Sequence, residues 1–514
     1  MRIGVDVGGT NTDAVVMDGA TVLASIKAPT TADVGAGVVA AIEGVLARSK
    51  VAPETIAGVM IGTTQFTNAI VERRRLVPVA IVRLALPATK SLNPLIDWPH
   101  DLVDTIGRNV YMAEGGYEVD GREISPLDEA EIARIARDIA AKGLESIAVS
   151  SVFAPLNSAQ EDRAAEIIHA EHPQAQITLS NEIGRVGLIE RENAAVMNAA
   201  LVQLSAKVVG SFREALKKLK INAPFFISQN DGTLMSAAYV ERYPVLTFAS
   251  GPTNSMRGAA FLSDQENAVV VDIGGTTTDV GVLARGFPRE SAVAVDVGGV
   301  RTNFRMPDVL AIGLGGGSLV RGDDAVTVGP DSVGFELTEK ALVFGGDTLT
   351  TTDIAVAAGL ADIGDRGSVA GLDDAAVVRA LGKIHAMVED AIDRMKTSAD
   401  PVPAILVGGG SILIERDLAG VSTLSVPEHS AVANAIGAAI AQVGGEVDRV
   451  FSYEQEGREN AIAQAKDEAQ AKAVDAGAEP ASIEIIEVEE IPLAYLPGAA
   501  CRVRVKAVGD LAGD

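Results

Sequence analysis

Two nearly identical glycine-rich octapeptides constrain the fold of this chain more than any other feature. The first, DVGGTNTD, runs from Asp6 to Asp13, and the second, DIGGTTTD, runs from Asp272 to Asp279. Six of their eight positions are identical, and each lies between two short β-rich runs. They begin 266 residues apart, which is about the size of one large domain. The sequence therefore predicts two related halves, each opening with a strand, a glycine-rich turn and a second strand.

The residue types in these turns suit the binding of phosphate. Glycine lets the backbone approach a ligand closely, and backbone N–H groups and threonine hydroxyls donate hydrogen bonds to phosphate oxygens. Asp6 and Asp272, at the ends of the first strands, would face a bound Mg²⁺ through water, because Mg²⁺ prefers oxygen ligands and dehydrates reluctantly. Two facing turns would clamp one triphosphate. The predicted phosphate-binding residues are Gly8, Gly9, Thr10 and Asn11 in the first turn and Gly274, Gly275, Thr276 and Thr277 in the second.

The last aspartate of each repeat has two possible roles. Asp13 or Asp279 could act as a catalytic residue that orients the attacking oxygen, or could equally cap the hairpin turn. One such hairpin alone would be an ordinary turn in most proteins, and it is the duplication that favours a phosphate site. A third turn, VDVGGVRT at residues 295–302, keeps Asp296 but has Val300 in place of the threonine. We interpret it as an ordinary turn.

Strand and helix patterns alternate along most of the chain, which favours an α/β fold with helices covering the sheets. The expected helices span residues 34–46, 128–141, 159–169, 188–219 and 375–394. The expected domains are a first half with an insertion at residues 1–185, a second half at 186–447, and a small acidic α+β domain at 448–514. Eleven acidic and three basic residues between positions 451 and 490 predict an amphipathic helix followed by a strand. We expect this last segment to pack on the main body or on a neighbouring subunit.

Charge and cysteine usage exclude several functional classes. The chain has 514 residues and a net charge of −26, which predicts neither a nucleic-acid partner nor binding to an anionic membrane. One cysteine and five histidines leave no zinc set and no internal disulfide, which suits a reducing compartment. No uncharged run reaches the roughly 20 apolar residues of a membrane span. We therefore expect a cytoplasmic protein.

Other motifs are weaker. GAGVVA at residues 35–40 matches a dinucleotide fingerprint but lies inside an expected helix, and no G-x-x-x-x-G-K-[ST] occurs, so a Walker-type ATPase is excluded. His169 and His172 could touch a metal, but a solvated surface pair is favoured. The run at residues 190–193, EREN, could line a substrate cleft, although an ion-paired helix start is favoured.

The duplicated turn resembles the actin, Hsp70 and sugar-kinase superfamily. That resemblance implies two ribonuclease-H-like halves with ATP bound in the cleft between them. A third element fits, because LVGGGSIL at residues 406–413 follows a strand where the superfamily has its adenosine-binding turn. The resemblance therefore adds Gly408, Gly409 and Gly410 to the expected nucleotide site.

Within the superfamily, the chain most resembles the A subunit of the hydantoinase and 5-oxoprolinase family. The strings that carry this resemblance are IGTTQFTNAIVERR, LIERENAAVMNAAL, FISQNDG, ASGPTNSMRGA, AIGLGGGS and TTTDIAVAAG, in this order from residue 61 to residue 359. The resemblance implies substrate contacts by Thr63, Thr64, Asn68 and Asn230. Ile61 replaces a usual histidine, and QNDG replaces Asn followed by two glycines, so the ring that is opened stays unspecified.

The resemblance also implies a reaction. The expected function is ATP-dependent, Mg²⁺-dependent phosphorylation of the carbonyl oxygen of a small cyclic amide. A separately encoded hydantoinase B-type subunit would then open the ring, in an oligomeric assembly. Two alternatives stay open, a non-catalytic ATP-driven switch or reactivase acting on a protein partner, and a small-molecule kinase.

Overall fold

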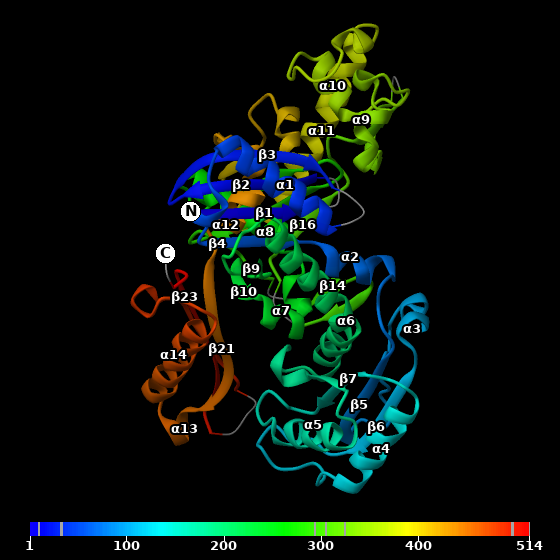
Figure 1. The fold of residues 1–514 in the computed structure, drawn as a ribbon, viewed down its shortest axis with the longest axis vertical. Helices are drawn as coiled ribbons and strands as arrows, with labels where there is room; N and C mark the ends of the chain where they lie inside the picture. The colour runs from blue at the N-terminus through cyan, green and yellow to red at the C-terminus, as the bar shows by residue number, and fades with distance from the viewer. Residues whose placement is uncertain are drawn as a thin grey trace.

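The computed structural model describes residues 1–8, 11–30, 34–291, 294–303, 306–322, 325–494 and 498–512. Gly9 and Thr10, two of the predicted phosphate-binding residues, lie outside the described residues. Figure 1 shows an elongated molecule, with the N-terminal strands in the middle, a small helical region at one end, and two separate lobes at the other.

The first half is built on one end of a nine-stranded sheet. Its first three strands, β1 (Arg2–Val7), β2 (Asn11–Asp18) and β3 (Thr21–Pro29), form an antiparallel meander. The strands β4 (Gly58–Thr63) and β9 (Phe225–Ser228) then add in parallel on the other side of β1. The resulting order is β3-β2-β1-β4-β9.

A second sheet repeats this pattern. The strands that repeat it are β11 (Val269–Ile273), β12 (Thr278–Ala284), β16 (Val309–Ile312), β19 (Val402–Val407) and β20 (Val421–Ser425), and the two-residue strand β13 (Phe287–Pro288) also pairs with β12. The order β16-β12-β11-β19-β20 and the direction of every pair match those of the first sheet. The two actin-like halves expected from the repeated octapeptide are therefore confirmed.

Two helices connect the halves. Helix α8 (Ser250–Ser263) packs against β4 of the first sheet and against β11, β12 and β19 of the second. Helix α12 (Ala433–Ala439) lies on β1, β2 and β4 and crosses α8. The crossing is close, because a Cβ atom on Gly258 would lie 1.9 Å from the Ala433 carbonyl oxygen, and one on Gly437 would lie 1.8 Å from the Asn254 carbonyl oxygen. Only glycine fits at these two positions.

The other face of the first sheet is covered by α1 (Val34–Ser49), and the long helix α6 (Leu188–Lys218) packs against α1 and shares the same hydrophobic core. Helix α6 is the one helix of the described residues with the length and apolar composition of a membrane span, and 72% of its most apolar window is buried inside the protein. In the second half, α11 (Asp374–Met395) packs on β11, β12 and β16. The helices expected near residues 34, 188 and 375 are thus confirmed.

An insertion between β4 and β9 forms the first separate lobe. Its four parallel strands, β5 (Val79–Leu86), β6 (Asn109–Glu114), β7 (Ser146–Ser151) and β8 (Gln176–Leu179), lie in the order β6-β5-β7-β8. The helices α3 (His100–Ile106), α4 (Glu129–Ala141) and α5 (Ala159–Glu171) accompany these strands. The two helices predicted from residues 128 and 159 match α4 and α5.

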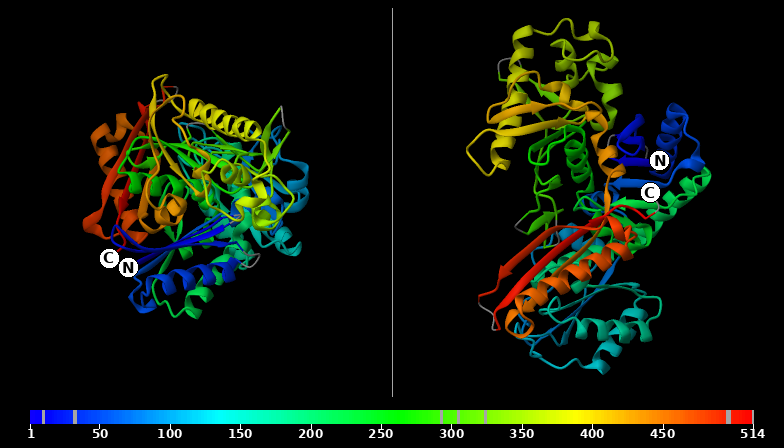
Figure 2. Two further views of the ribbon diagram at one scale, coloured as in Figure 1. Left: turned by 90° about the horizontal axis from the view of Figure 1, so that it is seen from above. Right: turned by 90° about the vertical axis from the view of Figure 1, so that its left-hand side faces the viewer.

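The C-terminal residues form the second separate lobe, the C-terminal module, with β21 (Gln442–Ser452), α14 (Arg458–Asp475), β22 (Glu484–Pro492) and β23 (Ala500–Gly509). Figure 2 shows these strands extending from the main body beside α14. Strand β21 pairs with β10 (Thr233–Ser236), so the module continues the nine-stranded sheet. The boundaries at 185/186 and 447/448 stay predictions, but strand pairing links segments across both of them.

Candidate functional site

The aspartates of the two octapeptides lie side by side within each half. Asp6 on β1 is directly opposite Asp13 on β2, and Asp272 on β11 is directly opposite Asp279 on β12. All four line one cavity of about 440 Å³. The predicted phosphate-binding residues that line the same cavity are Gly8, Asn11, Gly274, Gly275, Thr276 and Thr277. The two hairpins therefore face a common space, as the duplication predicts.

The cavity contains more negative than positive charge. Burial and the nearby Asp13 raise the pKa of Asp6 to about 6, and burial with the nearby Asp272 raises the pKa of Asp279 to about 7. Burial also raises the pKa of Asp272. Among the described lining residues Lys27 is the one base. Carboxylates that are buried together in this way are stabilised by a cation.

Three side chains hold the aspartates of the first half. Asn434, in the first turn of α12, donates to Asp6 Oδ2 and Asp13 Oδ2, both at 3.0 Å. Asn254 of α8 donates to Asp6 Oδ1 at 3.4 Å, and the Lys27 ammonium lies 2.9 Å from Asp13 Oδ2. The other oxygen of Asp13, Oδ1, is buried without a hydrogen-bond partner.

These residues fit a hydrated Mg²⁺. The donors are hard oxygens, the buried Asp13 Oδ1 still has an acceptor site to fill, and Asp6 and Asp279 are each buried beside a second aspartate, which together raise their pKa values. Within the described ranges, no three His, Cys, Asp or Glu side chains are placed to bind a metal together. A cation here would therefore be held mainly through water.

In each half, a glycine lies directly against the aspartate that is predicted to hold the metal. A Cβ atom on Gly62 of β4 would lie 2.3 Å from Asp6 Oδ1, and one on Gly408 would lie 2.3 Å from Asp272 Oδ1. Both glycines lie on or just after the strand that runs parallel to the aspartate's strand. The second half therefore repeats the first at the level of single side-chain positions.

The third predicted turn is only partly in the cavity. Gly408 and Gly409, directly after β19, line it. Gly410 instead faces the protein interior, where a Cβ atom would lie 2.4 Å from Ile273 Cγ2. The assignment of Gly410 to the nucleotide site stays a prediction, and of the three glycines Gly408 and Gly409 are the two that line the cavity.

The four predicted substrate residues do not line a common cavity. Thr64 lines the cavity of the two hairpins, whereas Thr63 is buried in β4. Asn68, one turn into helix α2 (Gln65–Glu72), donates to Thr64 Oγ1 at 3.4 Å. Asn230 lines a different cavity. The GTT string thus lies beside the first hairpin, because β4 pairs with β1.

Two sequence profiles of one family match most of the described chain. The profile of the hydantoinase/oxoprolinase N-terminal region matches residues 2–172, and that of hydantoinase/oxoprolinase matches residues 191–395. The chain belongs to the hydantoinase/oxoprolinase family. The first match covers the first hairpin and the insertion lobe as far as α5, and the second covers α6 from residue 191, α8 and the second hairpin.

Relatives in this family are subunits of larger enzymes. The chain is 28% identical over 252 residues to the acetophenone carboxylase gamma subunit of Aromatoleum aromaticum, and 26% identical over 313 residues to the caprolactamase subunit alpha of Pseudomonas jessenii. These matches cover 46% and 59% of this chain, but only 34% and 42% of the relatives. The chain therefore matches less than half of their length.

Two solved structures share the whole fold. The ATP-dependent caprolactamase from Pseudomonas jessenii superimposes with a TM-score of 0.78 at 20% identity, covering 100% of this chain and 88% of that chain. Nucleotide-free acetone carboxylase superimposes with a TM-score of 0.70 at 18% identity, covering 99% of this chain and 88% of that chain. At these identities the likeness concerns the fold alone. It includes the C-terminal module, which the two family profiles do not reach.

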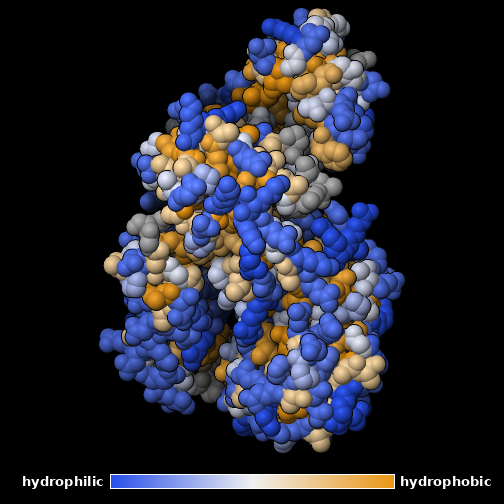
Figure 3. Space-filling view, viewed as in Figure 1, coloured by the Kyte–Doolittle hydropathy of each residue, from blue (hydrophilic) through white to orange (hydrophobic). Residues whose placement is uncertain are grey.

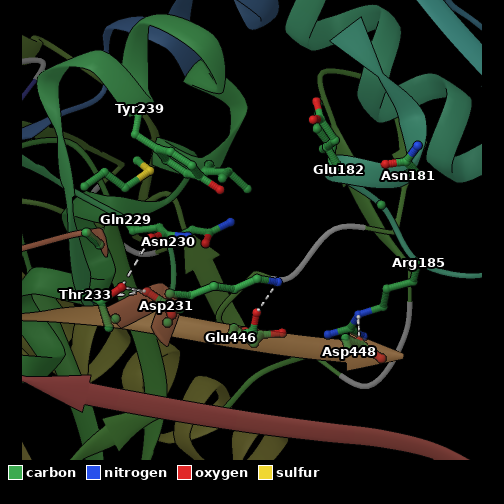
Figure 4. Close-up of a pocket in the computed structure, with 18 of the residues that line it drawn as sticks. Asn181, Glu182, Arg185, Gln229, Asn230, Asp231, Thr233, Tyr239, Glu446 and Asp448 are labelled. Carbon is green, nitrogen blue, oxygen red and sulfur yellow. Dashed lines mark hydrogen bonds and ion pairs between the residues drawn. The ribbon is translucent and has the colours of Figure 1, made fainter. Parts of the chain in front are cut away.

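This hydantoinase/oxoprolinase family member has a second cavity of about 510 Å³. It is lined by the end of the insertion lobe, the β9–β10 edge and the C-terminal module, and Figure 3 shows the surface hollowed between those two lobes. Figure 4 shows Arg185 directed at Asp448, with an ion-pair distance of 3.7 Å, and Asn230 on the opposite side. Asp231 is paired with Lys506 at 2.8 Å, and attraction to this ammonium lowers its pKa against the effect of burial.

Several other sequence features have structural roles. Glu192 of the EREN run forms a buried ion pair with Arg83 and accepts from Ser150 Oγ at 2.6 Å, so it is paired with strands β5 and β7 and not within its own helix. The third GG turn joins two short strands, and the Asp296 side chain caps it by accepting from Gly299 N at 2.8 Å. His172 is bonded to a backbone carbonyl.

Five further residues lie in or beside the hairpin cavity and were not predicted from the sequence, namely Lys27, Asn254, Ser255, Phe335 and Asn434. Asn254 and Ser255 belong to the string ASGPTNSMRGA, and Asn434 to the helix that follows the third glycine turn. The sequence signal for these three residues is a polar side chain within a helical segment of otherwise small, apolar residues. Lys27 and Phe335 stand in ordinary strand and loop sequence, which gives no such signal.

Proposed function

We propose that this chain is the ATP-binding subunit of an enzyme that activates the carbonyl group of a small cyclic amide. The observation that carries the proposal is the single cavity that both glycine-rich hairpins and all four of their aspartates line. Support for the amide class comes from the family and from the relative named caprolactamase subunit alpha. The relatives named as subunits support a separately encoded partner subunit. We further propose that the assembly is an oligomer and that it is located in the cytoplasm.

Amide resonance explains why ATP would be needed. It makes the carbonyl carbon a poor electrophile and the ring nitrogen a poor leaving group. In the proposed reaction the carbonyl oxygen bonds to the γ-phosphorus of ATP, the bond from that phosphorus to the β,γ-bridging oxygen breaks, and ADP leaves. Water then adds to the activated carbon and the ring C–N bond breaks with a proton going to the nitrogen, which leaves an acyl phosphate and a free amine. A second water hydrolyses the acyl phosphate to a carboxylate and inorganic phosphate. The second step belongs to the partner subunit.

The residues of this chain position the phosphates. Backbone N–H groups and hydroxyls of the two hairpins would donate to the triphosphate, while Asp6 and Asp272 would hold Mg²⁺ through water. The metal would neutralise the charge that develops on the bridging and terminal phosphate oxygens. Asp13, fixed by Lys27 and Asn434, or Asp279 on the opposite strand would orient the attacking oxygen. The catalytic contribution is therefore positioning and electrostatic stabilisation.

The first experiment measures phosphate and ADP release by the purified chain, with and without the subunit encoded beside it. Caprolactam, hydantoin and 5-oxoproline are the test substrates, and the expected result is ring-dependent stimulation that needs the second subunit. A chain that responds only to a protein partner is an ATP switch. A stable phosphate ester detected by mass spectrometry identifies a small-molecule kinase. Either result contradicts the proposal.

The second experiment tests the metal aspartates. Asp6→Asn and Asp272→Asn each remove a carboxylate from the cavity and should lower ATP turnover about 10²- to 10³-fold. Asp296→Asn is the matched control, because Asp296 precedes a pair of glycines in the same way but does not line the cavity. Full turnover by either cavity variant in the assembled enzyme would refute the metal assignment.

A second candidate activity is ATP-dependent carboxylation. Two of the relatives are named subunits of acetophenone carboxylase and acetone carboxylase. In that case ATP turnover should depend on bicarbonate and a ketone, and ¹⁴C-bicarbonate should enter an acid-stable product. Stimulation by a cyclic amide without bicarbonate distinguishes the proposed function from this one.

A further inference from the structure

The second cavity, between the insertion lobe and the C-terminal module, has no part in the proposed nucleotide site. Its volume of about 510 Å³ is enough for a small molecule, and the insertion lobe, the β9–β10 edge and the C-terminal module all contribute to its wall. Figure 4 shows polar side chains on facing sides of this space. The charges and hydrogen bonds of the wall indicate which class of ligand it fits.

The basic side chains of the wall are already paired with carboxylates. Each of the lining bases lies no farther than 3.7 Å from an acidic side chain: Arg185 from Glu290 and Asp448, Arg449 and Lys472 from Glu468, and Arg502 from Asp448. The Lys472 ammonium also donates to the Glu446 carbonyl at 3.0 Å. A cation whose charge is balanced in this way attracts a further anion only weakly. The wall therefore does not favour an anionic ligand.

Several acceptor groups of the wall, in contrast, are still available. Asp475 forms no hydrogen bond or ion pair with a side chain that the structure describes, and it is the last residue of α14, where the helix dipole adds negative charge. The Asn181 amide nitrogen donates to Glu161 at 3.0 Å, whereas its oxygen Oδ1 has no partner within the described ranges. The hydroxyl of Tyr239, across the cavity in Figure 4, has none among those residues either. These groups suit a positively charged donor of hydrogen bonds.

Much of the remaining wall is apolar. Leu234 and Met235 of β10, Ile183 of the insertion lobe and Leu246 contribute hydrocarbon surface to it. Tyr239 lies in α7 (Ala237–Arg242), and its side chain is 45% exposed, so its aromatic ring is accessible. The face of such a ring attracts a cation. The cavity thus combines apolar surface, an aromatic ring and unpaired acceptors.

We propose that the second cavity binds a small organic ammonium ion. The unpaired acceptors and the Tyr239 ring hold the charged nitrogen, and the apolar wall holds the hydrocarbon part. One source of such an ion is the reaction proposed above, because opening a cyclic amide releases an amine, which is protonated at neutral pH. A free cellular amine is the other source. The binding itself does not depend on the proposed function, and only the first source rests on it.

A titration of the full chain without nucleotide, followed by ligand-observed NMR, tests recognition of the charge. Pentylamine, hexanoate and caprolactam are compared at neutral pH, because their hydrocarbon parts are alike and their charges differ. Pentylamine should bind, and the other two should bind about tenfold more weakly or not at all. The inference is overturned if pentylamine does not bind, or if hexanoate or caprolactam binds as tightly.

Two variants test the named groups. Asp475→Lys reverses the unpaired charge and should weaken pentylamine binding about tenfold, and Tyr239→Leu removes the ring and should weaken it about 3- to 30-fold. Asp467→Lys is the matched control, because Asp467 is exposed on the same helix and does not line the cavity, so the affinity should change less than about twofold. Tyr239→Phe keeps the ring and should keep most of the binding. Equal losses in Asp475→Lys and Asp467→Lys would show an effect of overall charge and overturn the site.

A further ligand, 6-aminohexanoate, distinguishes the two sources. It is the ring-opened form of caprolactam, and Gln229, whose Oε1 accepts from Thr233 at 3.3 Å, has its Nε2 left to donate to the carboxylate. Tighter binding than pentylamine identifies the ring-opened product, whereas equal or weaker binding identifies a free amine. If amines bind but no cyclic amide stimulates ATP turnover, the proposed function fails and the ammonium site stands. If turnover is stimulated but no amine binds, the ammonium site alone is overturned.

Discussion

Gly62 and Gly408 show how tightly single residues are fitted at the candidate site. Gly62→Ala would place a Cβ atom 2.3 Å from Asp6 Oδ1 and 2.5 Å from Asn254 Nδ2, so both side chains must move. A displacement of about 1 Å at a reacting group lowers rates about 10²-fold, and we expect a loss of that size in steady-state ATP turnover. Gly382→Ala in the exposed part of α11, where a Cβ atom meets nothing within 4 Å, is the control and should keep full activity. Unchanged turnover by Gly62→Ala would contradict the assigned role of Asp6.

Lys27 gives a second prediction at the residue scale. Its ammonium is the one basic group among the described cavity residues and lies 2.9 Å from Asp13 Oδ2. Lys27→Met removes this charge and should lower kcat/KM for Mg·ATP about 10²-fold, while Lys27→Arg should recover part of it. The pair is partly exposed, so its contribution to stability is about 1 kcal/mol or less, and the thermal midpoint should move little. A large loss of stability with normal kinetics would assign Lys27 a purely structural role.

The sequence predicted the residues of the site that lie within repeated motifs and missed those that tertiary packing brings there. Asp6, Asp13, Asp272 and Asp279 could be identified because strand pairing places the two ends of each octapeptide opposite each other. Asn434 lies 428 residues from Asp6 in the sequence, and no local pattern indicates that distance. Three consecutive glycines likewise do not reveal which of them border the cavity, and the structure places Gly408 and Gly409 there.

At the scale of elements, α14 and β21 depend on a close contact. A Cβ atom on Gly445 would lie 2.2 Å from the Ala469 carbonyl oxygen and 2.3 Å from the Ala473 nitrogen, both backbone atoms of α14. Gly445→Ala should therefore push the helix away and destabilise the C-terminal module by about 1–3 kcal/mol. Faster hydrogen exchange in residues 458–475 would measure this. Gly210→Ala in α6, which meets nothing within 4 Å, should not increase exchange there.

Element prediction succeeded where helical periodicity was long and uninterrupted. The helices α4, α5, α6 and α11 begin within about two residues of their predicted starts, since capping residues and apolar spacing are local properties. The order of strands could not be obtained in the same way. Strands β9 and β10 follow a 31-residue helix in sequence, yet they join the sheet that begins at Arg2. Pairing over such separations depends on tertiary packing, not on local sequence.

At the scale of the whole molecule, the C-terminal module shares a hydrophobic core with the first half. Met60 of β4 and Phe226 of β9 belong to the same buried cluster as Val447, Phe451 and Val503. A chain that ends at residue 447 should therefore aggregate or lose more than about 10 °C of its thermal midpoint, because this apolar surface becomes exposed. Scanning calorimetry and gel filtration measure the result. A monomeric truncated chain with an unchanged midpoint would instead support an independent domain that starts at 448.

The overall architecture was predictable because it is duplicated. Two copies of one octapeptide, 266 residues apart, indicated two related halves, and the matching strand orders agree with that inference. The continuation of the first sheet into the C-terminal module was not predictable, because an acidic helix and two strands are equally compatible with a separate domain. Composition indicates which surfaces are exposed to solvent, but it does not indicate which sheet edge a strand will join.

The close crossing of α8 and α12 has a consequence for the evolution and transfer of this site. Asn254 and Asn434 reach Asp6 from these two helices, and Gly258 and Gly437 leave no spare room between them. The two hairpins and both helices must therefore be kept together for the site to form. A design that transfers only the two octapeptides to another scaffold would misalign the carboxylates. In a random mutagenesis screen, lesions at Gly258 or Gly437 should be scored as catalytic null alleles even though neither glycine borders the ligand.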